Sequence, residues 1–250
     1  MPTPFTHLRT AQMLLRDPQI PPEFRSLLDS QRSAFLLGNV AADARVNSGL
    51  RRADTHFYHY DQPISDHPWR VMMSLYPALQ TPRDTAQQAF LAGYVAHLSM
   101  DEVWTNEMLR THFFAREWGT DRHFRFFMLH ILLIYMDERD YALLEDWQAN
   151  TLFAARPVDW LPFMTDYDLM EWRDFIAAQV AGESQTLKIL GERTQRPPQD
   201  FRTVLDSPQR MQADLWNNVP FDVFQQVEQQ MYTFARDQMI VYLEETAAHR

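Results

Sequence analysis

Apolar residues recur every three or four positions along most of the chain, which is the spacing that lines one face of an α-helix. The pair Thr81-Pro82 has the form of a helix start, because a capping hydroxyl precedes a proline at the first helical position. The pattern predicts helices over residues 6–16, 23–30, 33–46, 68–75, 81–112, 121–136, 140–149, 166–192, 207–217 and 220–248. We therefore expect an all-α, multi-helix protein.

Two proline-containing breaks, at Arg156-Pro157 and Arg196-Pro197-Pro198, interrupt the helical pattern. Neither has the length of a flexible linker, and the sequence contains no repeat or low-complexity tract. These features favour a single all-helical domain over residues 1–250. The residues with candidate chemistry fall within 1–140, so we expect 141–250 to serve as a helical scaffold or as a cover for the site.

Composition and charge exclude several classes of function. The chain has only six glycines and contains neither a Gly-x-Gly-x-x-Gly nor a Gly-Lys-Ser/Thr run, which argues against nucleotide binding by those loops. A net charge of −10 argues against a nucleic-acid scaffold, because such proteins attract the phosphate backbone with positive charge. A bound metal would still supply local positive potential, so a phosphodiesterase remains compatible with this charge.

The absence of cysteine limits any metal site. Disulfides and thiolate zinc sites are excluded, and a transition metal must be held by His, Asp or Glu, which favours zinc, manganese or iron. The N-terminal residues lack a basic segment followed by an apolar stretch, and the longest apolar block, near 126–136, is too short to span a bilayer. We expect a soluble, cytoplasmic protein with no transmembrane segment.

The most informative segment is Gly93-Tyr94-Val95-Ala96-His97-Leu98-Ser99-Met100-Asp101. His97 and Asp101 are four residues apart, so they share one face of the predicted helix and can bind the same divalent cation. A core histidine hydrogen-bonded to a carboxylate would leave the same pattern. In either case Asp101 needs a partner, because burying an unpaired carboxylate is costly.

Three more polar residues stand in largely apolar surroundings: His7, Asp43 and His56. Each has an ordinary explanation, respectively a first-turn surface residue, a helix-end carboxylate facing water and a polar loop residue. Their order along the chain, followed by the His-x-x-x-Asp pair, instead predicts that all of them converge on one metal site.

These segments resemble the zinc-dependent phospholipase C family, which is related in fold to the zinc-dependent single-strand nucleases. The resemblance covers about the first 110 residues and rests on four ordered motifs: Thr6-His7-Leu8, Phe35-Leu36-Leu37-Gly38-Asn39-Val40-Ala41-Ala42-Asp43, Thr55-His56-Phe57, and Gly93 through Asp101. It implies an all-α fold with a metal site between helices.

The resemblance also implies a set of ligands and a reaction. One zinc would be held by Asp43, His56, His97 and Asp101, and Asp101 would bridge to a second zinc held by His7. The implied activity is hydrolysis of a phosphate ester, a phospholipid or another phosphodiester, by metal-bound hydroxide. Asp43 would orient or deprotonate the attacking water.

The chain departs from the family pattern in three places. Secreted family members use a processed N-terminal amine as a ligand, and we see no processing signal at Met1. Ala42 stands where the family often has proline, and the downstream histidines do not form the His-x-x-x-Glu pair that holds a third metal in the secreted enzymes. We expect this third site to be missing, or rebuilt with Glu107 or His112. Two other hypotheses remain open: a non-catalytic helical protein with a structural metal, and a helical interaction module without metal.

Overall fold

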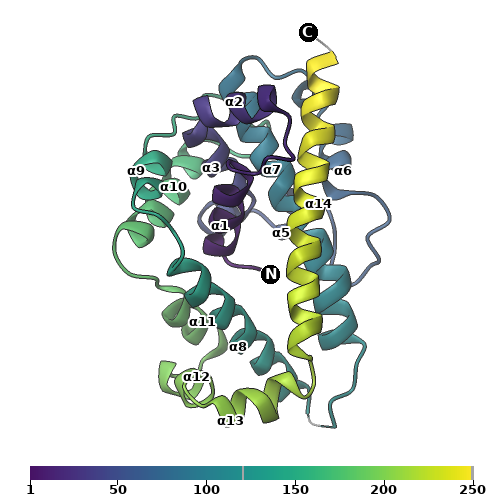
Figure 1. Ribbon diagram of the computed structural model, residues 1–250, viewed down its shortest axis with the longest axis vertical. Coiled ribbons are helices and arrows are strands. Elements are labelled where there is room, and N and C mark those ends of the chain that lie inside the picture. The colour runs from purple at the N-terminus through teal and green to yellow at the C-terminus, as the bar shows by residue number, and fades with distance from the viewer. Residues whose placement is uncertain (120, 249–250) are drawn as a thin grey trace.

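The computed structural model describes residues 1–119 and 121–248, apart from the side chain of Asn47, and every regular element in this part of the chain is a helix (Figure 1). The all-α prediction is confirmed. In chain order the elements are α1 (Pro4–Leu14), α2 (Pro22–Ser30), α3 (Arg32–Ala41), η1 (Ala42–Ala44), α4 (Arg45–Ser48), α5 (Arg52–His56), α6 (Pro68–Leu75), η2 (Pro77–Gln80), α7 (Thr85–Val103), η3 (Trp104–Phe114), α8 (Arg122–Tyr141), α9 (Trp147–Phe153), α10 (Asp166–Ala181), α11 (Thr186–Thr194), α12 (Pro198–Leu205), α13 (Pro208–Arg210), η4 (Met211–Trp216) and α14 (Phe221–Ala248).

Helices α3 and α7 pack closely against each other because a glycine lies on each of them at the crossing. A Cβ on Gly38 would lie 1.9 Å from the carbonyl oxygen of Phe90, and a Cβ on Gly93 would lie 2.4 Å from that of Phe35. The two backbones are therefore in direct contact. This contact brings the last turn of α3, with Asn39, beside the turn of α7 that carries His97.

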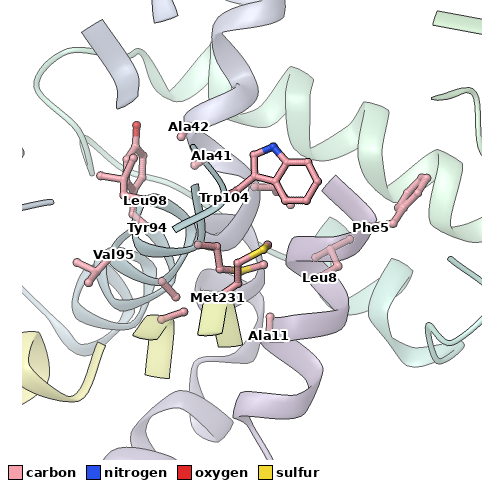
Figure 2. Close-up of a cluster of buried hydrophobic side chains, with 14 of the residues drawn as sticks. Phe5, Leu8, Ala11, Ala41, Ala42, Tyr94, Val95, Leu98, Trp104 and Met231 are labelled. Atoms are coloured by element: carbon pink, nitrogen blue, oxygen red, sulfur yellow. The ribbon is translucent and has the colours of Figure 1, made fainter. Parts of the chain in front are cut away.

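The core continues from this crossing to α1 and α14. Figure 2 shows Phe5, Leu8 and Ala11 of α1 in one apolar cluster with side chains of α7 and with Met231 of α14. Helix α1 packs on α3 and α8, and the long α14 packs along α7 (Figure 1). Because its neighbours cover it, α1 buries even polar residues such as His7.

Two helices begin at residues other than the expected ones. The expected start at Thr81-Pro82 is wrong: α7 begins at Thr85, where the Asp84 carboxylate accepts a hydrogen bond of 2.8 Å from the backbone N–H of Gln87. Asp84 is the better placed cap because it is extended and directly precedes the helical backbone. Helix α1 likewise begins at Pro4, before the expected Thr6.

The expected helix over 166–192 is two helices. Gly182 leaves the helical conformation (φ −123°, ψ −105°), and the chain resumes as α11 at Thr186. Helix α12 was not predicted, although Pro198 occupies the first position of that helix, where a missing N–H is harmless. It stays a prediction that residues 1–140 carry the chemistry and that residues 141–250 serve as a scaffold or cover.

No helix in the described ranges combines the length and the apolar character that crossing a membrane requires.

A buried carboxylate on α8 links that helix to the start of α11. Asp137 accepts hydrogen bonds of 3.0 Å from the hydroxyls of Ser184 and Thr186. Burial raises the pKa of Asp137 to about 6, although these hydroxyls act in the opposite direction. The folded protein therefore retains this proton at pH values where the unfolded chain, with an Asp pKa of 3.8, has lost it.

Replacing Asp137 with Asn is expected to raise the stability of the protein at pH 8, relative to its stability at pH 4, above that of the wild type. The free energy of unfolding of the wild-type protein falls as the pH rises from about 4 to about 6, because in this interval only the folded state still binds the proton of Asp137. The difference of about two pKa units corresponds to at most ~3 kcal/mol. Urea unfolding of zinc-free protein at pH 4 and pH 8 checks this, and identical pH dependence in both proteins would contradict it.

Candidate metal centre

The five residues expected at a metal site lie together, on four helical elements that are separate in the sequence. These residues, which we name the His/Asp cluster, are His7 on α1, Asp43 in η1, His56 at the end of α5, and His97 and Asp101 on α7. All five are buried. Ligand atoms of His7, His97 and Asp101 lie within 4.8 Å of one another, and those of Asp43, His56 and His97 form a second such group.

Local backbone features position these side chains. The expected helix over 33–46 tightens after Ala41 into the short turn η1, which carries Asp43. Helix α5 ends at His56, where Phe57 takes a left-handed conformation (φ 61°) that is rare outside glycine. The Tyr94 hydroxyl donates a 2.8 Å hydrogen bond to the carbonyl of Thr55 and so ties this end of α5 to α7.

Asp101 is the centre of the His/Asp cluster. Its Oδ2 atom lies 3.3 Å from His56 Nε2 and 3.5 Å from His97 Nε2. Its Oδ1 atom lies 3.6 Å from His7 Nε2. The two carboxylate oxygens therefore face different sets of imidazoles, an arrangement typical of a carboxylate that bridges two cations.

Hydrogen bonds on the far side of two imidazoles set their tautomers. His97 Nδ1 donates to the carbonyl oxygen of Asn39 at 2.8 Å. His56 Nδ1 lies 2.9 Å from the Thr55 hydroxyl, which itself donates to the carbonyl of Arg52, so we assign the proton to Nδ1. Both rings thus direct an unprotonated Nε2 at the carboxylates. Backing of this kind is usual for histidines that bind metals.

The buried polar atoms of the His/Asp cluster lack the partners that a closed core would provide. Within the described part of the chain, Nε2 of His7, His56 and His97 and Oδ1 of Asp101 form no hydrogen bond. Buried polar groups in this state are costly unless a cation or water satisfies them.

The spacing of these atoms suits zinc. Two atoms that each bind zinc at about 2.1 Å and at a tetrahedral angle are about 3.4 Å apart. The separations of the carboxylate oxygens from the imidazole nitrogens are 3.3, 3.5 and 3.6 Å at Asp101, and His56 Nε2 lies 3.6 Å from Asp43 Oδ1. These values exceed hydrogen-bond lengths, so the residues are arranged around a shared point rather than bonded in pairs.

Electrostatics also favours a cation. Burial lowers the pKa of His7 to about 4, with a further contribution from His97, and burial together with the Arg52 charge lowers the pKa of His56. Burial opposes ionisation of Asp101, but His97 and the neighbouring imidazoles overcome it and hold the pKa of this carboxyl well below its usual range. His97 differs from the other two imidazoles: burial disfavours its charged form, but the Asp101 carboxylate outweighs burial and raises the pKa of His97. The His/Asp cluster therefore holds carboxylates that stay ionised and that attract positive charge.

Sequence reasoning missed Arg52. Its guanidinium lies 4.3 Å from the centroid of the Tyr58 ring and 4.2 Å from that of the Tyr60 ring, and its Nη2 lies 3.4 Å from Asp101 Oδ2. A signal was present, because Arg52 precedes His56 by four residues and so shares a face of the short helix α5.

The alternative residues for a third metal site, Glu107 and His112, are not members of the two groups of ligand atoms described above. Glu107 and His112 are both on η3, where Glu107 is exposed and His112 is buried. Among the described residues, neither belongs to a group of side chains that could hold a metal ion. The expectation that the third site is missing or rebuilt stays a prediction.

Asp43 connects the His/Asp cluster to a cavity. Its side chain is 13% exposed, whereas the side chains of His7, His56, His97 and Asp101 are 0% exposed. The cavity that Asp43 lines has a volume of about 560 Å³. A larger cavity of about 780 Å³, near Arg83 and Trp160, has none of the five cluster residues in its wall.

Comparison with known proteins agrees with this geometry. A family model described as zinc dependent phospholipase C matches residues 4–168, which is more than half of the chain and includes all five residues of the His/Asp cluster. No curated protein and no solved structure matches the chain significantly. The chain therefore belongs to the zinc dependent phospholipase C family, and zinc is the metal that its buried histidines and aspartates are positioned to hold.

Proposed function

We propose that the protein hydrolyses a phosphate ester, either a phospholipid or another phosphodiester, with one or two zinc ions bound by the His/Asp cluster. Membership of a zinc-dependent phospholipase family supports the hydrolase class. The observation that carries the proposal is the set of unpaired Nε2 atoms spaced around carboxylate oxygens at zinc-binding separations.

In this proposal, Asp43, His56, His97 and Asp101 would hold one zinc, and His7 and Asp101 would hold a second. The opposite orientation of the two Asp101 oxygens supports a bridging role. The rings of His7 and His97 are stacked with centroids 3.9 Å apart, which supports two ions that lie close together.

The chain's own residues supply orientation and proton handling. The Asn39 carbonyl and the Thr55 hydroxyl hold His97 and His56 with Nε2 toward the ion. Asp43 is the cluster residue that reaches the cavity, so its carboxylate is placed to orient a water molecule or accept its proton. Bound zinc supplies Lewis acidity, which acidifies water and stabilises negative charge on a phosphoryl oxygen.

The alternative is a non-catalytic protein in which zinc only stabilises the fold. Structural zinc sites are closed by four protein ligands, whereas catalytic sites keep an open position. The four residues assigned to the first zinc would fit a closed site, whereas the second zinc, with His7 and Asp101, would keep open positions. The exposure of Asp43 to a cavity large enough for a small ligand favours the catalytic proposal.

Removing zinc tests the proposal. Hydrolysis of bis(4-nitrophenyl) phosphate is expected to fall at least tenfold in a chelator and to return with zinc but not with magnesium, because His and Asp ligands in a compact site select zinc. Elemental analysis of the same sample should find one or two zinc ions per chain. Zinc-loaded protein that hydrolyses none of several classes of phosphate ester would favour the structural role instead.

A further inference from the structure

The cavity beside Asp43 has a mainly apolar wall built by both halves of the chain. Helices α8 and α11, which pack against each other in the lower part of Figure 1, form part of the wall together with α10 and η3. The volume of about 560 Å³ lies within the range of small-ligand sites, about 300–1,000 Å³. Apolar side chains of the wall include Leu109, Leu129, Leu133, Trp172, Ile176 and Leu190.

Two arginine side chains interrupt this apolar wall, and no acidic side chain is paired with either of them in the described part of the chain. Arg45, the first residue of α4, and Arg193, near the end of α11, both line the cavity. In the described ranges neither side chain forms an ion pair or a hydrogen bond, and the Nε atom of Arg45 is buried without a partner. The lining residues include one carboxylate, Asp43, whose charge belongs to the His/Asp cluster.

Positive charge continues past the cavity. An adjoining cavity of about 450 Å³ shares Phe126 and His130 with the first and is also lined by Arg122 and Arg196. The Arg122 guanidinium lies 5.2 Å from the centroid of the Phe126 ring, so an aromatic face supports it. Four arginines thus line the two cavities, whose walls include one carboxylate, in a chain whose net charge is −10. Arg196 is paired with Asp200 at 3.7 Å, so Arg45, Arg193 and Arg122 supply the uncompensated charge.

We propose that this pair of cavities binds an anionic amphiphile, with its tail on the apolar wall and its negatively charged head on Arg45 and Arg193. Resting on the proposed function, this makes the preferred substrate a phosphate ester whose polar head carries net negative charge. A quaternary ammonium head is disfavoured, because zinc neutralises the charge of Asp43 and the arginines then repel a cation.

Two probes with the same tail and different heads test this inference without requiring turnover. Dodecyl phosphate and dodecylphosphocholine, each below the concentration at which it forms micelles, are titrated into zinc-loaded full-length protein. Tryptophan fluorescence reports binding, since Trp172 lines the cavity. Dodecyl phosphate is expected to bind at least tenfold more tightly than dodecylphosphocholine.

Variants separate the arginines from zinc as the source of this preference. The change Arg193→Gln, at an exposed position, and the double change Arg45→Gln with Arg193→Gln are expected to reduce the preference stepwise, the double variant to less than threefold. Arg32→Gln is the matched control, because Arg32 is an exposed arginine at the opposite end of α3 from Asp43. Zinc content is verified for each protein.

The outcomes distinguish this inference from the proposed function. Equal binding of the two probes by the wild-type protein, or an undiminished preference in the double variant, would overturn the inference. Preferential binding that disappears in the double variant supports it even when no ester is hydrolysed, in which case the proposed function alone fails. Hydrolysis without the head-group preference would leave the proposed function standing and the inference refuted.

Discussion

Replacing Asp101 with Asn is expected to weaken zinc binding by more than about 100-fold and to abolish hydrolysis. Residues that merely support metal ligands are worth about 10–100-fold in affinity, so loss of the carboxylate at the centre of the cluster should exceed this. The amide keeps the shape of Asp101 but removes the negative charge that lies 3.3–3.6 Å from three imidazoles. Competition with a chromogenic chelator measures the affinity.

The adjacent residue provides the control. Glu102 is also on α7, but its carboxylate lies 2.9 Å from His67 Nδ1. Glu102→Gln makes the same chemical change one position away and should leave zinc affinity unaltered. Wild-type protein at a zinc concentration about 1,000 times its dissociation constant should gain about 4 kcal/mol of stability, and the Asp101 variant at the same zinc concentration should gain less than about 1.5 kcal/mol. Zinc binding by Asp101→Asn with wild-type affinity would refute the assigned ligand set.

Replacing Gly93 with Ala is expected to destabilise the zinc-free protein by about 3 kcal/mol, which is at the upper end of the usual cost of overpacking. The new Cβ would lie 2.4 Å from the Phe35 carbonyl oxygen and 2.8 Å from Asn39 Nδ2. The first contact is with backbone, which cannot rotate away as a side chain would. Helix α3 must therefore shift, and the Asn39 carbonyl must shift with it, away from His97 Nδ1.

The sign of the change makes this prediction informative. In a helix interior, alanine is normally favoured over glycine by about 1 kcal/mol, so helix propensity alone predicts that Gly93→Ala is stabilising. Urea unfolding of the zinc-free protein measures the free energy, and zinc affinity should fall in the same variant. A variant as stable as the wild type would show that α3 and α7 can separate without cost.

Periodicity predicted the helical fold because burial of apolar faces decides whether these segments are helices. The boundaries were less accessible, since two nearby residues can compete to cap the same helix. Thr81 and Asp84 are both good capping residues, and only the packed structure shows that Asp84 does so. The sequence contains a glycine at position 182, where α10 ends, but a single glycine does not show where the next helix begins.

The grouping of the His/Asp cluster was accessible from the sequence through ordered motifs that resemble a known family. The contribution of Arg45 and Arg193 was not, because nothing local relates a residue of α4 to one of α11. Their shared cavity exists only after distant helices have packed. Burial of His7 was hidden in the same way, since it depends on α3 and α8 covering α1.

The limited exposure of Asp43 has a consequence for how the protein gains and loses its metal. The remaining members of the His/Asp cluster have side chains that are 0% exposed, so we expect an ion to enter and leave past this carboxylate. A molecule bound in the 560 Å³ cavity that Asp43 lines would obstruct that route. Metal exchange and ligand binding should therefore compete for one passage, and the protein should release its ions faster when this cavity is empty than when it is filled.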